Sequence, residues 1–559
     1  MADPGRRLAD ALAHHRAGQL DQALAGYRAV LDDKPDSADA HHLIGLALDQ
    51  KGEHDAAIDA IEQAVALKPA SGLFRFNLAR VLSEAGLVDR ARDAYRAAID
   101  LKPGDADAHS NLGLLEESDG NPDAALAAFE AALAADPGHM KARVNLARML
   151  IALKRSDDAA PHLKHLTSSA NAPAEAWFLT GTLAEDAERY DDAIAAYRRA
   201  LKIAPDFEKA RNNLGTALLG AQRYGEARQI FNAIFVAKRG DAGADAGVFS
   251  DQRFPARANT RLRTCRYRLS DGADQIDYLL AKDLLDPSWA AAAQRYRDAI
   301  AAIDREHPAD KPVVLEGPEA NALADLHDHA IRVADTAPLA GPAIGQKNDY
   351  AAIEDAYLAA ATSITTIDGF LSPEALNALR NYCRQSTIFF GHNATGYVTS
   401  YMADGFGCSL LYTVAEELQA AMPRVLGSRP LHNMWVYRHA NHSGGVDAHT
   451  DDASVTFNFW ITEADANLEP EHGGLILYQR EQPLDWDWVD MNLRKNDPDV
   501  KAKYTAFLAE APEVRLPYGE NRAILFHSNL LHKSDRLTFK EGFDQRRMNV
   551  TLLFGERGT

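Results

Sequence analysis

Residues 104–137 read GDADAHSNLGLLEESDGNPDAALAAFEAALAADP, and the pattern of this stretch recurs every 34 residues along the first part of the chain. Proline recurs at one position of the pattern, with Asn171 in place of one copy: Pro35, Pro69, Pro103, Pro137 and Pro205. A glycine or alanine recurs at a second position: Gly45, Ala79, Gly113, Ala147, Gly181 and Gly215. Alanine recurs at a third: Ala23, Ala57, Ala91, Ala125, Ala159, Ala193 and Ala227. Self-similarity at this fixed period indicates a solenoid of repeated units.

These three positions resemble those of the tetratricopeptide repeat, in seven copies over about residues 4–240. The small residue lets the first helix of a unit approach the second, and the alanine permits close packing against the next unit. Proline ends the second helix, because it lacks an N–H group and clashes with the preceding turn. Residues 1–240 are therefore predicted to form an all-α solenoid.

Four first helices carry an asparagine two residues before the small position: Asn77, Asn111, Asn145 and Asn213. In the tetratricopeptide family this position lines the inner groove. An amide can donate to and accept from a peptide backbone at once, so this asparagine series predicts a protein or peptide ligand. The alternative is that Asn-Leu-Gly is simply common in the repeat consensus, and the series is interrupted by Leu43 and Leu179.

The charge and the cysteines exclude several classes of protein. Among 559 residues there are 60 Lys and Arg against 80 Asp and Glu, a net charge of −20. This acidity argues against nucleic acid and an anionic membrane surface as partners. Three distant cysteines exclude a disulfide framework and a Cys-x-x-Cys zinc site. The N-terminal residues lack the apolar core of a secretory signal, and no run of about 18 apolar residues could span a bilayer. We expect a cytoplasmic protein.

Residues 241–361 are predicted to be a linker and a helical bridging region between the two ends of the protein. Residues 238–250 are mostly small or polar and glycine-rich, which is typical of a linker. From Gln275 to Ile303 the apolar residues recur at helical spacing, with one proline break. A further helical run, ALADLHDHAIRVA, follows.

From about Ser363 the sequence becomes rich in strand signals. SITTIDGFLSPEALNALRNYC predicts a strand, a turn and a helix capped near Ser372. Short runs with β-branched and aromatic residues follow: LHNMWVYRH, SVTFNFWIT, GGLILYQ, AILFH and RRMNVTLLFG. Many short strands in one domain favour a barrel or a double-sheet jelly roll. Residues 362–559 are predicted to form a double-stranded β-helix (jelly roll) with flanking helices.

The sequence His449-Thr450-Asp451 offers two metal ligands, because residues two apart on a strand point the same way. A third ligand has to come from a distant strand, and His532 is the candidate, with His527 as its rival. Two histidines and one carboxylate form the facial triad that holds non-heme Fe(II) with open positions. A co-substrate and O2 require such positions.

The last predicted strand supplies an anchor for that co-substrate. Arg547 and Asn549 share one polar face with Thr551, and Asn458 lies on a similar polar face of an earlier strand. These faces imply a polar cavity between sheets. A guanidinium binds a carboxylate in a bidentate fork, so Arg547 is the candidate clamp, with Asn458 and Asn549 as further co-substrate contacts.

This constellation, over about residues 362–559, resembles the Fe(II)- and 2-oxoglutarate-dependent oxygenases. The matching strings occur in the family's order: IDGFLSPEALNAL, VYRHANHSGGVDAHTD, GGLILY, AILFHSNLLHKSD and the arginine strand. The domain is most similar to the bacterial branch in which tetratricopeptide repeats precede it. The resemblance implies His449, Asp451 and His532 as iron ligands and Arg547 as the 2-oxoglutarate clamp. It also implies that Tyr437 hydrogen-bonds the 2-oxoglutarate carboxylate, and that hydroxylation accompanies conversion of 2-oxoglutarate to succinate and CO2.

The resulting hypothesis is a dioxygenase that hydroxylates a protein or peptide presented by the repeats. Three alternatives remain. The protein could hydroxylate a small molecule or glycan precursor and use the repeats for assembly. It could be a non-enzymatic scaffold with a degenerate oxygenase fold, or a zinc or manganese jelly roll, since the same ligand types suit those metals. His439 and His442, just before the HTD sequence, are expected to be surface loop residues.

Overall fold

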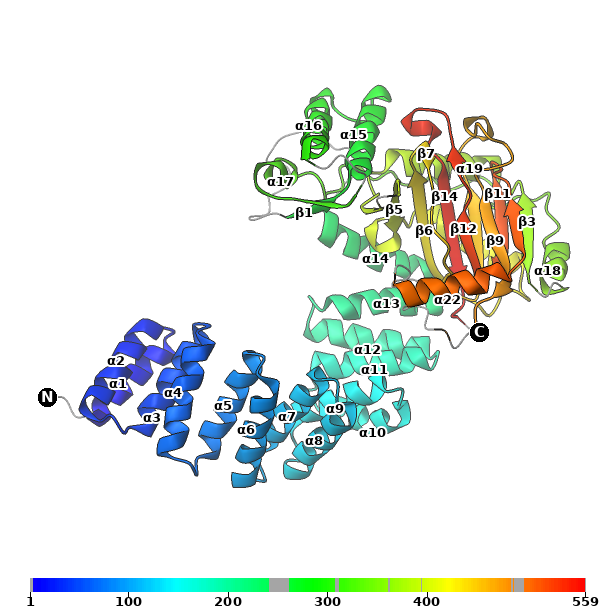
Figure 1. Cartoon of the computed structure of the whole chain (residues 1–559). Helices are drawn as coiled ribbons and strands as arrows, with labels where there is room; N and C mark the ends of the chain where they lie inside the picture. Colours follow the sequence, from blue (N-terminus) through cyan, green and yellow to red (C-terminus); the bar gives the residue numbers. More distant parts are fainter. Residues whose placement is uncertain are drawn as a thin grey trace. The chain divides into compact units, whose positions relative to one another are not determined.

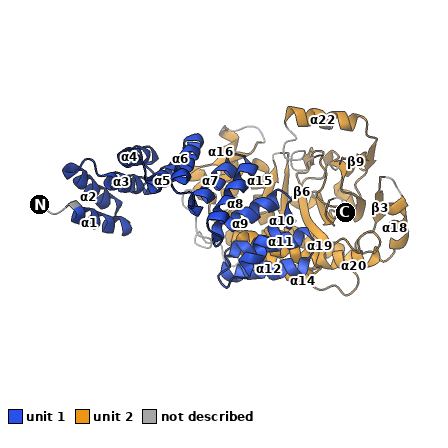
Figure 2. Ribbon diagram, turned by 90° about the horizontal axis from the view of Figure 1, so that it is seen from below, with its two compact units in different colours: residues 1–207 blue, residues 208–559 orange. Residues whose placement is uncertain are grey.

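The computed structural model describes residues 4–240, 261–306, 311–359, 362–393, 395–483, 486 and 497–557. Residues 241–260 of the predicted linker therefore lie outside the described residues. The chain divides into two compact units, residues 1–207 and 208–559 (Figure 2). The predicted boundary at residue 240 follows the end of the sequence repeat, whereas the compact units divide before the seventh repeat.

The first unit consists of helices in antiparallel pairs (Figure 1). In chain order they are α1 (Pro4–Arg16), α2 (Leu20–Asp33), α3 (Ala38–Gln50), α4 (His54–Leu67), α5 (Gly72–Glu84), α6 (Val88–Leu101), α7 (Ala106–Ser118), α8 (Pro122–Ala135), α9 (Met140–Ala152), α10 (Ser156–Thr167), α11 (Ala174–Asp186) and α12 (Tyr190–Ile203). The all-α solenoid predicted for the N-terminal region is confirmed.

Capping residues and prolines set the helix ends of this unit. Helices α3, α5, α7 and α9 each follow a side chain that accepts a hydrogen bond from a backbone N–H three residues later: Ser37, Ser71, Asp105 and His139. Such a cap satisfies a donor that has no partner within the helix. Helices α2, α4, α6, α8 and α12 end two residues before a proline of the repeat, as predicted.

The small positions of the repeat permit the close packing that the sequence predicts. A Cβ added at Gly113 would lie 2.6 Å from the Phe129 ring, and one at Gly181 would lie 2.5 Å from the Tyr197 ring. The seven alanines of the third series are completely buried. Any larger side chain at these positions would force neighbouring helices apart.

The second unit begins with the seventh repeat and ends with antiparallel strands. Its helices are α13 (Glu208–Gly220), α14 (Tyr224–Arg239), α15 (Arg266–Ala281), η1 (Pro287–Trp289), α16 (Ala290–Glu306), α17 (Gly317–Leu323), α18 (Tyr350–Ala359), α19 (Pro373–Gln385), η2 (Met402–Asp404), α20 (Ser409–Ala421), η3 (Ala464–Ala466), α22 (Pro498–Ala509) and η4 (Phe543–Gln545). Its strands are β1 (Leu262–Thr264), β2 (Val313–Leu315), β3 (Ile364–Asp368), β4 (Gly391–Asn393), β5 (Tyr397–Tyr401), β6 (Leu431–His439), β7 (His442–Ser443), β8 (Val455–Trp460), β9 (Leu475–Glu481), β10 (Glu513–Leu516), β11 (Arg522–His527), β12 (Leu530–Ser534), β13 (Leu537–Thr538) and β14 (Met548–Phe554).

The seventh repeat, α13 and α14, is packed into the second unit. The Tyr224 hydroxyl donates to Gln419 Oε1 at 2.7 Å and accepts from the Leu431 N–H at 3.1 Å, at the start of β6. Phe231 and Phe235 of α14 are buried. Helix α13 contacts β6, and α14 contacts α20 and η2.

Two larger antiparallel sheets follow, in addition to the two-stranded pairs β1-β2 and β13-β7. Seven strands pair in the order β3-β11-β8-β14-β6-β5-β4, and three pair in the order β10-β9-β12. Trp460 and Phe526 of the larger sheet share an apolar cluster with Leu475 and Leu477 of the smaller one. The structure therefore confirms a C-terminal region of antiparallel sheets, and the double-stranded β-helix stays a prediction.

Single elements agree closely with the sequence, with two exceptions. Ser372 caps α19 as predicted, its side chain accepting from the Ala375 N–H. The predicted helical run after residue 321 ends at Leu323, and the segment around His449 is not a regular strand. Within the described residues, no helix has the length and apolarity needed to cross a membrane.

Candidate metal centre and its pocket

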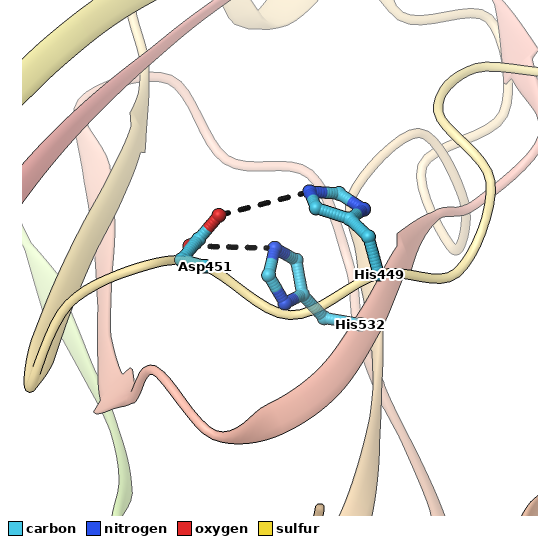
Figure 3. Close-up of side chains that lie close together, drawn as sticks. All are labelled: His449, Asp451 and His532. Carbon is cyan, nitrogen blue, oxygen red and sulfur yellow. Dashed lines mark ion pairs between the residues drawn. The ribbon is translucent and has the colours of Figure 1, made fainter. Parts of the chain in front are cut away.

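His449, Asp451 and His532 lie together, with their ligand atoms within 4.8 Å of one another (Figure 3). His449 Nε2 is 3.7 Å from Asp451 Oδ1, and His532 Nε2 is 3.6 Å from Asp451 Oδ2. The aspartate and His532 are buried, and His449 is partly exposed. Ligand atoms from one loop and from strand β12 therefore converge beside a cavity.

Backbone pairing holds the three residues in place. His449 and His532 exchange backbone hydrogen bonds of 3.0 and 2.9 Å, although only His532 belongs to a strand, β12. The Asp451 N–H donates to the Ser528 carbonyl at 3.2 Å. The expected strand around His449 is thus a loop joined by a single bridge, and the bridge brings the two imidazoles to a centroid separation of 4.3 Å.

Neighbouring groups orient the side chains. His449 Nδ1 lies 2.8 Å from the Asp447 carbonyl, and His532 Nδ1 lies 3.1 Å from the Leu530 carbonyl. A carbonyl only accepts, so Nδ1 carries the proton in each ring and Nε2, on the side of Asp451, carries the lone pair. The Thr456 hydroxyl donates to Asp451 Oδ2 at 2.9 Å. Such outer contacts are typical of residues that bind a metal.

The donor set fits one divalent ion. Bonds of about 2.0–2.2 Å put two ligands of one ion at most about 4.4 Å apart, and both carboxylate–imidazole distances lie inside that limit. A second cluster, Asp49, His54 and Glu84, lies in the first unit. There Arg80 pairs with Asp49 at 2.7 Å and with Glu84 at 2.6 Å, so a cation already neutralises those carboxylates.

A small cavity of about 10 Å³ lies at the three residues. Three adjacent strands supply its wall: Trp435 and Tyr437 of β6, Asn458 of β8, and Asn549 and Thr551 of β14. Asn549 pairs with Tyr437 in register, and Asn458 Nδ2 donates to Thr551 Oγ1 at 3.2 Å. The structure thus brings Tyr437, Asn458 and Asn549 to the same cavity as the two histidines and the aspartate.

Arg547 is a buried cation that forms no salt bridge within the described residues, although the Asp535 carboxylate acts on it from further away. It lies just before β14, and its side chain has one hydrogen bond to the described part of the protein, from Nη2 to the Gly474 carbonyl at 3.3 Å. Its Nε has no partner there. Burial lowers the pKa of Arg547 to about 9, which still leaves a cation at neutral pH. A charge buried in this way calls for an anionic partner.

Several other buried polar atoms of the described chain have no hydrogen-bond partner: Trp435 Nε1, Asn458 Oδ1, Asn549 Oδ1 and both ring nitrogens of His439. Buried polar groups are normally satisfied, so the unpartnered atoms of Trp435, Asn458 and Asn549, which line the cavity, call for ordered water or a ligand. Trp435 Nε1 donates and the two amide oxygens accept, so the partner has to offer both an acceptor and donors.

His439 was not predicted as a site residue. It ends β6 and is fully buried, so the expectation of a surface loop is wrong for it. Burial, reinforced by the nearby Arg547 cation, holds the pKa of His439 well below its usual range, so the ring is neutral. Strand alternation is the signal that puts it on the same face of β6 as Tyr437, which lines the cavity. His442 is exposed and pairs with Glu541, as expected of a surface histidine.

The rival ligand His527 lies at the end of β11, where its Nδ1 is 3.3 Å from Glu481 Oε1. It does not belong to the group of His449 and Asp451.

Tyr437 is protonated. Burial raises its pKa well above the usual range, so its hydroxyl keeps its proton.

The asparagine series is divided between the units. Asn77, Asn111 and Asn145 lie half-buried on α5, α7 and α9, and Asn213 lies on α13 of the second unit. The Asn77 amide is 2.9 Å from His42 Nε2, and Asn111 hydrogen-bonds Tyr95. Part of the hydrogen-bonding capacity of Asn77 and Asn111 is therefore used within the repeats.

Family comparison identifies the repeats. Residues 8–72, 76–139 and 178–242 match one tetratricopeptide-repeat family, and residues 118–180 match a second tetratricopeptide-repeat family. The N-terminal region is therefore an array of tetratricopeptide repeats, a class that generally binds peptides or proteins on an extended concave surface. No curated protein matches the chain.

Solved structures similar to part of the chain include three proteins. The pilF protein of Pseudomonas aeruginosa is 20% identical, with a TM-score of 0.34, over 37% of this chain and 95% of its own. PilW, a type IV pilus biogenesis factor, is 20% identical over 37% and 96%, with a TM-score of 0.34. YrrB, a TPR protein with an unusual peptide-binding site, is 18% identical over 33% and 95%, with a TM-score of 0.29. These likenesses do not bear on function.

Proposed function

We propose that the second unit is an Fe(II)- and 2-oxoglutarate-dependent dioxygenase that hydroxylates a protein or peptide bound by the repeats. The observation that supports it most directly is the two-histidine, one-carboxylate group, together with Arg547, a buried cation that forms no salt bridge within the described residues. Fe(II) suits that ligand set, and the far carboxylate of 2-oxoglutarate suits the guanidinium. The predicted double-stranded β-helix is part of this proposal.

Each residue then has a defined task. His449 and His532 bind Fe(II) through Nε2 and Asp451 through its carboxylate, while Arg547 holds the 2-oxoglutarate carboxylate. The Tyr437 hydroxyl and the Asn458 and Asn549 amides orient the co-substrate. With Fe(II), 2-oxoglutarate and O2 bound, such a site couples formation of succinate and CO2 to hydroxylation of an aliphatic C–H bond. The walls of the cavity exclude water from it.

Anaerobic titration of the full chain with Fe(II) and 2-oxoglutarate tests the proposal. We expect a weak visible charge-transfer band that disappears in His532→Ala and weakens in Arg547→Ala. His527→Ala, five residues upstream of His532, is the matched control and keeps the band. Absence of both the band and 2-oxoglutarate affinity in the wild type would contradict the proposal and leave the protein-interaction scaffold that the repeats alone support.

Deletion of the repeats distinguishes a protein substrate from a small-molecule substrate. Their family binds proteins or peptides, which favours a protein substrate. Deletion of residues 4–207 is expected to raise the KM for a protein substrate and to leave uncoupled 2-oxoglutarate turnover unchanged. Unchanged turnover of a small substrate would instead favour the alternative in which the repeats serve assembly, and zinc or manganese in the purified protein would favour the other-metal alternative.

A further inference from the structure

Helix α15 contacts Arg438 and Arg546, which directly precede His439 and Arg547 in the sequence. Its Asp271 is completely buried and receives Arg438 Nε at 2.9 Å and Nη2 at 2.5 Å. Arg546 Nη1 donates to the same carboxylate at 3.0 Å, and its Nη2 contacts Asp274 one turn further along α15. The helix belongs to the predicted bridging region. Two of its carboxylates nevertheless bind Arg438, near the end of β6, and Arg546, two residues before the start of β14.

The two arginines are the sequence neighbours of His439 and Arg547. Arg438 precedes His439, and Arg546 precedes Arg547. The two segments are joined by a backbone hydrogen bond of 3.0 Å from the His439 N–H to the Arg547 carbonyl. Because successive residues of extended chain point to opposite sides, Arg438 and Arg546 turn toward α15. His439 and Arg547 turn to the face on which Tyr437 and Asn549 line the cavity.

The direction of the Arg547 side chain depends on this backbone. Its only hydrogen bond to the described protein is the long one to Gly474, and it lies before the first paired residue of β14. The Thr462 hydroxyl holds the same segment by donating to the Arg546 carbonyl at 2.9 Å and accepting from the Met548 N–H at 2.8 Å. Asp271 supplies the remaining restraint, from the helix side.

We propose that Asp271 is a positioning residue for co-substrate binding: by holding Arg438 and Arg546 it aims Arg547 and His439 at the carboxylate of 2-oxoglutarate. This inference rests on the proposed function. It makes α15 part of the co-substrate site, although no atom of the helix reaches the cavity. A small misplacement of a binding group by a distant substitution is enough to weaken a geometrically demanding contact.

The test compares 2-oxoglutarate and metal affinities of the full chain by calorimetry, without O2. In Asp271→Asn we expect the Kd for 2-oxoglutarate, measured with Mn(II) bound, to rise about tenfold. The Kd for Mn(II) alone is expected to stay at the wild-type value, because His449, Asp451 and His532 are held by other elements. Asp277→Asn is the control: Asp277 is an exposed residue of the same helix, pairs with Arg297, and is expected to leave both affinities unchanged.

A milder variant covers the case in which Asp271→Asn does not fold. Asp274→Asn removes only the second partner of Arg546 and leaves the Asp271–Arg438 pair, and we expect about a threefold rise in the 2-oxoglutarate Kd. Wild-type 2-oxoglutarate affinity in these variants, with loss in Arg547→Gln, would overturn the positioning role and leave the proposed function standing. Equal loss of Mn(II) and 2-oxoglutarate affinity would also overturn it, because that indicates general destabilisation. A wild type without 2-oxoglutarate affinity would refute the proposed function itself.

Discussion

Arg547 and Arg438 are equally buried but differ in their partners, and this difference predicts opposite effects on stability. Replacing an unpaired buried cation by methionine removes a desolvation cost, so Arg547→Met is expected to raise the free energy of unfolding by about 1–3 kcal/mol without ligand. Arg438→Met leaves part of the Asp271 charge uncompensated and is expected to lower it by about 3 kcal/mol. Urea denaturation of the full chain followed by tryptophan fluorescence measures both. Destabilisation of similar size in the two variants would mean that Arg547 has a protein counter-charge.

His42 predicts a pH dependence of the repeat array. It is buried between Asn77 and the Phe74 ring, and burial lowers its pKa to about 4. Since the unfolded value is about 6.5, the unfolded chain binds more protons between these values. The contribution of neutral, buried His42 to the free energy of unfolding is therefore fully present above pH 6.5. It is lost as the pH is lowered toward 4, which lowers the free energy of unfolding by up to about 3 kcal/mol. Urea denaturation followed by helical circular dichroism at pH 7 and pH 5 measures this difference in the free energy of unfolding. His42→Gln is expected to reduce the difference, and an unchanged difference would contradict the role of His42.

Some site residues could be predicted from the sequence and others could not, for a physical reason. Alternation along a strand is local, so it predicted that Asn549 lies on the same face as Thr551, and both line the cavity. The same rule applied to Tyr437 would have found His439, but the polar run that follows it suggested a loop. The role of Asp271 could not be predicted from the sequence, because its partners Arg438 and Arg546 lie 167 and 275 residues away and no periodicity relates them.

At the scale of the element, two glycines in turns of the repeat array are expected to differ in how much their replacement by alanine lowers stability. Gly86 joins α5 to α6 with φ +74°, and an added Cβ would meet nothing within 4 Å. Gly86→Ala is therefore expected to cost about 1 kcal/mol through backbone conformation alone. Gly104, between α6 and α7, also has open space but an ordinary φ, so Gly104→Ala is the matched control. Urea denaturation followed by helical signal compares them, and equal stability would refute the argument.

Elements with strong periodicity were predicted well, and those set by tertiary pairing were not. Strands β6, β8 and β14 coincide with runs of β-branched and aromatic residues to within two residues. The segment at His449 has strand-like alternation, but Gly445, with φ +71°, precedes it and only one bridge forms. Pairing with His532 depends on the distant strand β12, which local sequence does not encode.

At the scale of the whole molecule, the division at residue 207 predicts which fragments fold. A fragment of residues 208–559 keeps the hydrogen bonds of Tyr224 and the apolar contacts of α14, and is expected to be monodisperse with cooperative unfolding. A fragment of residues 241–559 lacks them and exposes apolar surface, so it is expected to aggregate. Size-exclusion chromatography and thermal denaturation distinguish the two. Equal Tm values would show that the seventh repeat contributes nothing to the second unit.

The sequence identified the repeats but not this division. The seventh copy keeps the small residue at Gly215 and the alanine at Ala227, so its pattern is that of the other six. What separates it is the set of partners met by Tyr224 and Phe235, which include Gln419, Leu431 and Phe390. The partners of Tyr224 lie 195 and 207 residues later, and no repeat period relates them.

The buried outer face of α14 has a consequence for how the array can change in evolution or design. Arrays of repeats usually need a terminal helix with a polar outer face to stay in solution. Here Phe235 packs against Phe390 and Gly405 of the C-terminal fold, which takes the place of such a cap. Whole 34-residue units can therefore be inserted or removed between α1 and α12 without a new cap, whereas a unit added after α14 would separate the last repeat from the surface that covers it.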